Sequence, residues 1–228
     1  MAVTLAAAGY RVIAIARGET KELAAASSHA AAEGRGAIEF RAFDLTELTQ
    51  IGALVRSLRG AVGPIYGLIN NAGLGTAGVL GNMRDADIER LVRLNTVSPI
   101  LLTKYAVRSM MTAREGRIIN IASIVASTGY SSLSVYSATK ASLVGFTRSL
   151  AREVGQLGVT VNAIAPGFIG TEMTRELTEA QRQQIANRSA LKRLPDAVDV
   201  AQCALYLLSD AARNITGTVL TVDAGNTA

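Results

Sequence analysis

Tyr136 and Lys140 stand four residues apart in a stretch that reads as a helix, and Ser123 ends an apolar run upstream of them. Residues i and i+4 lie on one face of a helix, so the phenol and the ammonium can address the same point in space. A strand that ends at Ser123 could bring a hydroxyl to that point. Three side chains of these kinds suit proton transfer to a carbonyl oxygen.

The elements that must position these side chains follow a regular order. Strand-like apolar runs alternate with longer helical stretches, and the runs cover residues 12–16, 38–43, 67–70, 117–122, 159–164 and 218–222. Alternation of this kind predicts an α/β fold with a parallel sheet covered by helices on both faces. No linker, repeat or low-complexity tract divides the chain, so we predict one domain over residues 1–228.

Composition excludes several classes of protein. The chain has 228 residues, of which 49% are hydrophobic and 18% charged, and no apolar run approaches the roughly 20 residues of a membrane span. Lys and Arg outnumber Asp and Glu by 23 to 18, but without a basic block that would indicate nucleic acid. The one histidine and one cysteine offer no metal site. A single cysteine allows no disulfide within the chain, which agrees with a cytoplasmic location.

A lone Y-x-x-x-K arises often by chance, so the neighbouring motifs matter. Asn70-Asn71-Ala72-Gly73 closes an earlier strand, Asn95 interrupts an amphipathic helix, and Pro166-Gly167-Phe168-Ile169-Gly170-Thr171 follows the run 159–164. In this order the set resembles the short-chain dehydrogenase/reductase family, over Leu5 to Gly225, and in particular its members similar to 3-oxoacyl-[acyl-carrier-protein] reductases. The resemblance implies a Rossmann-type doubly wound sheet and reduction of a ketone by hydride transfer.

The resemblance also implies a role for each catalytic position. Ser123 would donate a hydrogen bond to the substrate oxygen, and Tyr136 would supply the proton. Lys140 would lower the pKa of the phenol and bind the nicotinamide ribose. Asn95 matches the residue that positions a water behind that lysine, although an Asn inside a helix can instead bond its own backbone.

The cofactor contacts are carried over in the same way. Arg17 follows the first strand-like run, and its planar fork suits a 2′-phosphate, so we predict NADPH over NADH; the alternative is an exposed Arg without a ligand. By the same resemblance, Asp44 and Leu45 would border the adenine, and Asn71 the adenine-side ribose. Ile169 and Thr171 would meet the nicotinamide carboxamide. Cofactor contacts are also implied at Ala72, Gly73, Pro166 and Gly167.

The start of the chain departs from the family. The first strand and the T-G-x-x-x-G-I-G turn that holds the pyrophosphate are missing from this sequence, and residues 5–10 match the end of the first helix. We therefore expect an N-terminally incomplete domain, with a genuine deletion that yields a non-binding protein as the alternative. Residues 171–194 correspond to the family's substrate lid, and a plain pair of surface helices is the other interpretation.

The sequence leaves more alternatives open for the substrate and the oligomeric state than for the fold. Acyl carrier proteins are acidic, and Arg114 matches a basic position that serves them in the resembling reductases, whereas Leu157 stands where a second basic residue is expected. Three functions stay open: a reductase of acyl-carrier-protein thioesters, an oxidoreductase of free small ketones or alcohols, and an inactive scaffold subunit. The family forms homotetramers or homodimers, and Val135, Leu143, Phe146 and Leu150 offer apolar surface for one, although some of it must face the sheet.

Overall fold

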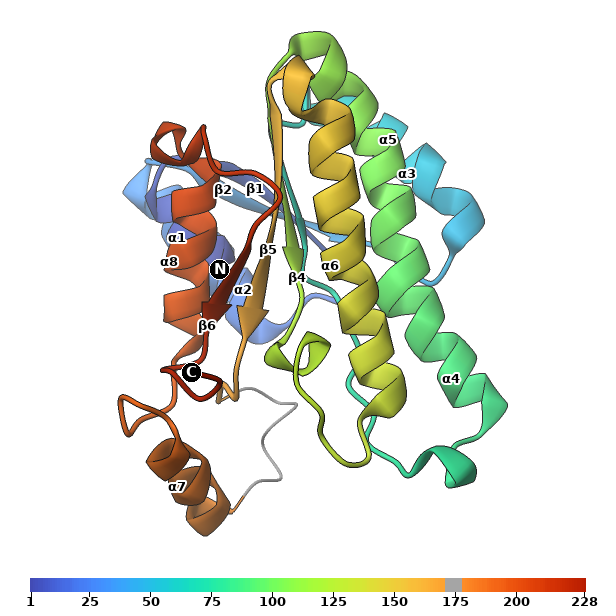
Figure 1. Cartoon of the computed structure of the whole chain (residues 1–228). Coiled ribbons are helices and arrows are strands. Elements are labelled where there is room, and N and C mark those ends of the chain that lie inside the picture. The colour runs from blue at the N-terminus through green and yellow to red at the C-terminus, as the bar shows by residue number, and fades with distance from the viewer. Residues whose placement is uncertain (171–177) are drawn as a thin grey trace.

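All six predicted strands are present, within two residues of their predicted bounds (Figure 1). The fold comes from a computed structural model that describes residues 1–170 and 178–228. The strands are β1 (Arg11–Ala16), β2 (Ala37–Ala42), β3 (Gly67–Asn70), β4 (Gly116–Ile121), β5 (Val159–Pro166) and β6 (Val219–Val222). Every paired strand is parallel to its neighbour, which confirms the predicted α/β class.

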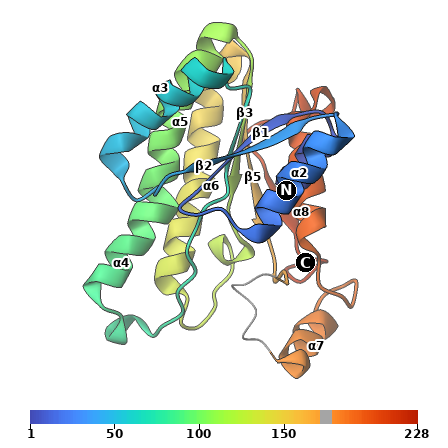
Figure 2. The same ribbon diagram turned by 180° about the vertical axis from the view of Figure 1, so that it is seen from behind.

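Helices cover both faces of this strand layer, as Figures 1 and 2 show from opposite sides. One group packs against one face and comprises α1 (Ala2–Ala7), α2 (Lys21–Glu33) and α8 (Ala197–Leu208). The other face carries α3 (Ile51–Val62), α4 (Asp85–Val92), α5 (Ser98–Ala113) and α6 (Ser134–Val154). The remaining described helix, α7 (Glu179–Arg188), projects from the body of the molecule. None of the described helices is both long and apolar enough to cross a membrane.

The central strands β4 and β5 are almost entirely buried. All six residues of β4 are buried, and successive side chains enter different cores: Ile118 packs with α5 and α6, whereas Ile119 packs on the α8 side. A strand covered on both faces needs apolar residues at consecutive positions, because its side chains alternate between the faces. This requirement explains the continuous apolar runs in the sequence.

A buried polar network also runs along one face of this sheet, from α5 to α6. Asn70 on β3 and Asn120 on β4 are paired in register, and Asn70 Nδ2 donates to Asn120 Oδ1 at 2.7 Å. Asn70 Nδ2 also donates to Thr103 Oγ1 on α5 at 3.0 Å, and Asn120 Nδ2 donates to Thr147 Oγ1 on α6 at 2.8 Å. This asparagine–threonine network ties α5 and α6 to the strands that lead into the candidate site.

The strands form two sheets rather than one. The ladders join β1 to β2, and separately β3 to β4, β5 and β6, so β1 and β3 share no ladder. Two tyrosines link the sheets at their amino ends: the rings of Tyr10 and Tyr66 stack with centroids 6.3 Å apart, and both hydroxyls donate to the carbonyl oxygen of Leu208, at 3.4 and 2.7 Å.

Candidate active site

Ser123, Tyr136 and Lys140 meet where β4 ends and α6 begins. Ser123 is two residues beyond β4, and Tyr136 and Lys140 occupy the first two turns of α6. The Ser123 hydroxyl lies near enough to the Tyr136 phenol to influence its pKa as a hydrogen-bond partner. Lys140 Nζ lies 5.8 Å from the centre of the Tyr136 ring. The structure therefore brings together the three side chains that the sequence singled out.

The ammonium of Lys140 is held in a buried position. The residue is 4% exposed, and its Nζ donates to the carbonyl oxygen of Ile121 at 2.8 Å. Burial lowers the pKa of Lys140 to about 8, because an ammonium without water is less favourable than a neutral amine. Gly73 lies beside it, and a Cβ at that position would stand 3.4 Å from both Lys140 Nζ and Asn95 Oδ1. The loop after β3 therefore closes directly over the lysine.

The predicted effect of Lys140 on Tyr136 is not seen in this structure. Burial raises the pKa of the phenol, and the hydrogen bond from Ser123 opposes that rise. The expected lowering by Lys140 was wrong for this arrangement because the ammonium is turned toward Ile121 and lies over the ring. Removal from water disfavours the charged phenolate, and here it outweighs the hydrogen bond.

Asn95 is buried and joins two parts of the site. Leu74 N–H donates to Asn95 Oδ1 at 2.8 Å, and Asn95 Nδ2 donates back to Leu74 O at 2.8 Å. The same Nδ2 donates to Thr139 Oγ1 on α6 at 3.2 Å. The alternative that Asn95 bonds its own helix backbone does not describe these contacts, since its partners are 21 and 44 residues away in sequence.

Three hydroxyl residues at this point were not identified from the sequence: Thr96, Thr139 and Ser142. Asn95 and Thr96 belong to a π-helical turn, Arg93–Val97, between α4 and α5. Thr96 Oγ1 lies 2.9 Å from Ser142 Oγ, and Thr139 receives the bond from Asn95. The position of Thr139 just before Lys140 was visible in the sequence, but nothing there pairs residue 95 with residue 139.

The predicted contacts with the 2′-phosphate and the adenine lie at the carboxyl ends of β1 and β2, and Asn71, predicted at the adenine-side ribose, follows β3. Arg17 is exposed at the end of β1. Asp44 Oδ1 accepts from the backbone N–H and the hydroxyl of Thr46 at 2.8 and 2.7 Å, and these bonds lower the pKa of the carboxyl. The nearby charges of Arg17 and Arg90 lower it further. The Leu45 side chain packs into the core beside α3, which leaves its backbone for a ligand.

The predicted nicotinamide contacts follow β5. Pro166 pairs with Val222, and Gly167 N–H donates to Val222 O at 2.9 Å. A Cβ on Gly167 would come 2.6 Å from that of Asp223, so only glycine fits this crossing. Ile169 is buried. Thr171 and the first part of the predicted lid, residues 171–177, lie outside the described residues.

The structure also places the residues named in two predictions about the surface. Arg114 precedes β4, whereas Ser123 follows it, so within one chain Arg114 lies at the opposite end of that strand from the site. Its guanidinium donates to Gln156 O at 2.9 Å. Leu143 and Leu150, expected among residues that could pair subunits, are 2% and 7% exposed and belong to the chain's own core.

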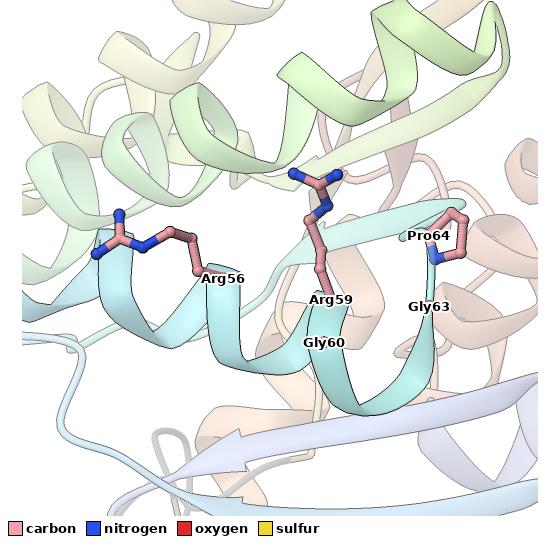
Figure 3. A pocket seen from close by; sticks show the side chains of 5 residues that line it. All are labelled: Arg56, Arg59, Gly60, Gly63 and Pro64. Carbon is pink, nitrogen blue, oxygen red and sulfur yellow. The ribbon is translucent and has the colours of Figure 1, made fainter.

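A separate hollow lies away from the candidate active site. It has a volume of about 380 Å³ and is lined by Arg56, Arg59, Gly60, Gly63 and Pro64 (Figure 3). These residues come from the end of α3 and the turn before β3. The hollow is therefore near the amino end of β3, while the candidate site follows the carboxyl ends of the strands. Among the described residues, no group of three or more His, Cys, Asp or Glu side chains could hold a metal ion.

The described residues fit a nicotinamide dinucleotide at its two ends. Arg17 offers an exposed guanidinium beside β1, and the glycine at position 73 leaves room beside Lys140 Nζ that a side chain would fill. For the pyrophosphate between these ends, the sequence has no turn with the glycine spacing of such sites, and we assign no residue to it.

A parallel α/β fold with Ser, Tyr and Lys converging at the strand ends is typical of oxidoreductases that use a nicotinamide cofactor. The family model described as enoyl-(acyl carrier protein) reductase matches residues 1–227. The 3-oxoacyl-[acyl-carrier-protein] reductase FabG of Escherichia coli (strain K12) is 39% identical over 225 residues, which cover 99% of this chain and 90% of that protein. The FabG of Haemophilus influenzae is 40% identical over 225 residues, covering 99% and 91%.

Two solved structures are similar throughout. A gluconate 5-dehydrogenase from Burkholderia cenocepacia J2315, in complex with NADP and tartrate, superposes with a TM-score of 0.92 at 28% identity and covers 99% of this chain and 89% of its own. A blue fluorescent protein from a metagenomic library, in complex with NADPH, gives a TM-score of 0.90 at 32% identity, covering 100% and 92%. The chain belongs to the short-chain dehydrogenase/reductase family, whose members are NAD(P)-dependent oxidoreductases.

Proposed function

We propose that this protein reduces the ketone of a 3-oxoacyl thioester to a secondary alcohol with NADPH as the cofactor. The observation that carries the proposal is the meeting of Ser123, Tyr136 and a buried Lys140 where β4 ends and α6 begins. Relatives that are 39% and 40% identical over nearly the whole chain are 3-oxoacyl-[acyl-carrier-protein] reductases, which supports the substrate class.

The residues of the site divide the work of proton transfer. When bound, the cofactor supplies a hydride to the carbonyl carbon. Ser123 donates a hydrogen bond to the ketone oxygen and stabilises the negative charge that develops there. Tyr136 transfers its phenolic proton to that oxygen, which completes the alcohol. A phenol with a raised pKa stays protonated at neutral pH, as an acid in this direction must be.

A free small ketone is the second candidate substrate. The gluconate 5-dehydrogenase has nearly the same fold, and Leu157 stands where a basic residue for an acidic carrier is expected. Arg114 also lies at the far end of β4 from the site, so it would serve a carrier only from another subunit of an assembled enzyme. For the assembly we propose a homotetramer or homodimer, and for the location the cytoplasm.

The first test is to titrate the purified 228-residue chain with NADPH and with NADH and to measure binding by the fluorescence of the cofactor. We expect selective binding of NADPH, because a guanidinium at Arg17 can pair with the 2′-phosphate. Arg17→Ala should weaken NADPH binding by about 10- to 100-fold and leave NADH within about threefold, as expected for the loss of a charged hydrogen-bonding pair.

Arg35→Ala is the matched control, since it removes an exposed arginine before the amino end of β2. It should leave both affinities unchanged. Failure of the parent chain to bind either nucleotide would contradict the proposed function, and equal binding of both would contradict the role of Arg17.

The second test separates the candidate substrates. We would compare kcat/KM for a 3-oxoacyl thioester on an acyl carrier protein, the same acyl group on a short free thiol, a 2-enoyl thioester, and a panel of free ketones and sugars. Preference for the carrier-bound 3-oxo compound supports the proposal. Equal kcat/KM for the carrier-bound and free thiol forms would contradict recognition of the carrier protein. Faster reduction of free ketones would favour the second candidate substrate.

A further inference from the structure

Asn95 has no spare amide hydrogen. Its Oδ1 accepts from Leu74 N–H, and its Nδ2 donates to Leu74 O and to Thr139 Oγ1. The residue is 1% exposed, and a primary amide has only two N–H donors. Both side-chain N–H groups of Asn95 are therefore committed to holding the loop after β3 against α6.

The hydroxyl of Thr139 passes this connection on to the catalytic turn. Because Asn95 Nδ2 can only donate, Thr139 Oγ1 must accept from it, and the one hydroxyl proton is free to go elsewhere. It is donated to Tyr136 O at 2.7 Å. In an α-helix that carbonyl also accepts the amide N–H of the residue four positions later, which here is Lys140. One carbonyl therefore connects Thr139 to the backbone of both Tyr136 and Lys140.

A second connection runs beside the first. Ser142 Oγ donates to Thr139 O at 2.7 Å, so its lone pairs must accept from Thr96 Oγ1, 2.9 Å away. Thr96 and Asn95 are neighbours in the π-helical turn. This turn thus fastens α6 at two successive points, and Thr139 takes part in both through its side chain and its carbonyl.

We propose that Thr139 is a positioning residue, whose hydroxyl couples Asn95 and the loop at Leu74 to the turn of α6 that orients the Tyr136 phenol. The proposal rests on the proposed function for its kinetic consequence, but its geometric part does not. Misplacing a reacting group by about 1 Å can cost on the order of 100-fold in rate, so the effect should appear mainly in kcat.

Thr139→Val tests this with little change of shape, since valine keeps the branched side chain and removes the hydroxyl. We expect kcat to fall by about 10- to 100-fold with KM within about threefold. Thr139→Ser restores the hydroxyl and should recover kcat to within about threefold of the parent. Thr139→Ala is the second hydroxyl-free variant, and its comparison with Thr139→Ser decides the question should Thr139→Val not fold.

Thr147→Val is the matched control. Thr147 lies two turns further along α6, is as deeply buried as Thr139, and also accepts a hydrogen bond from an asparagine, at 2.8 Å from Asn120 Nδ2. Thr139→Val and Thr147→Val should lower the melting temperature similarly. Only Thr139→Val should change kcat, because Thr147 is not bonded to the turn that carries Tyr136.

A measurement without substrate distinguishes this inference from the proposed function. Tyrosine labelled at Cζ with a carbon isotope visible by NMR reports the environment of each of the six phenols, and Tyr136→Phe identifies the resonance of Tyr136. That resonance should shift in Thr139→Val, stay near its parental position in Thr139→Ser, and remain unchanged in Thr147→Val.

The outcomes separate as follows. A shifted resonance in a chain without reductase activity would contradict the proposed function and support the positioning role. An active parent whose Thr139→Val and Thr139→Ala variants keep both kcat and the resonance would overturn the positioning role and leave the function standing. Equal losses of kcat in Thr139→Val and Thr147→Val would also overturn it, since the effect would then follow stability alone.

Discussion

The four-stranded sheet and the two-stranded sheet hold their terminal residues in different ways. At the end of β4 in the larger sheet, Lys140 is buried and is bonded to Ile121 O, and Asn95 is bonded to two other segments. At the ends of β1 and β2, Arg17 is exposed and Asp44 accepts hydrogen bonds from Thr46 within its own turn. The catalytic side chains are thus held by contacts within the protein, while the adenosine side presents an exposed charge.

Burial explains the contrast. Strands β4 and β5 are covered on both faces, and a buried polar group there is stabilised by a partner within the protein, as Asn120 and Asn162 are. Strands β1 and β2 are only partly buried, so water can satisfy the groups at their ends. Prearranged donors at the reacting atoms favour catalysis, since no reorganisation is needed during the reaction.

The largest effect is expected from Tyr136→Phe, which removes only the phenolic oxygen from the candidate active site at the end of β4. Ketone reduction should fall by about 10² to 10⁴ in kcat, the usual contribution of a general acid, with cofactor affinity nearly unchanged. Tyr206→Phe, at an exposed phenol on α8, serves as the control in steady-state assays. Activity of Tyr136→Phe within about tenfold of the parent would contradict the assignment of Tyr136 as the general acid.

A smaller effect is expected in the pH dependence of stability at Lys140. The folded-state pKa of Lys140, about 8, lies below the ordinary lysine pKa of 10.5. The cost of burying the charge is therefore fully present below pH 8 and is relieved as the pH rises toward 10.5. The parent should gain up to about 3 kcal/mol of unfolding free energy relative to Lys140→Met over this window. Urea unfolding of both proteins from pH 7 to 10 measures it, and a constant difference would contradict the burial argument.

The smallest effect sharpens the comparison between the sheets themselves. Asn120→Ala breaks the asparagine–threonine network at its centre and leaves Thr147 Oγ1 without its donor, so the unfolding free energy should fall by about 1 to 3 kcal/mol. Glu39→Ala on β2 removes the partner of Arg11 at a side chain that is 45% exposed, and its effect should be smaller. Urea midpoints measure both, and a larger loss in Glu39→Ala would reverse the comparison.

Much of the fold was predictable from the sequence. Six strands were located to within two residues because buried parallel strands require continuous apolar runs, and such runs are distinctive. Ser123, Tyr136 and Lys140 were also predictable, since local spacing places two of them on one helix face and the third at the end of a strand. Leu143 and Leu150 were harder to place, because helical spacing alone does not tell which apolar face turns toward the sheet.

The sequence by itself determined which chemical groups are available: a phenol, an ammonium and a hydroxyl at strand and helix ends, with a guanidinium at the end of another strand. The tertiary structure decided how those groups behave. Burial turns Lys140 toward Ile121 O, lowers its pKa and raises that of Tyr136. The tertiary fold also pairs Asn95 with Thr139, which are 44 residues apart in the sequence. Desolvation and long-range hydrogen bonds depend on which segments meet in space, and no local pattern in a sequence encodes them.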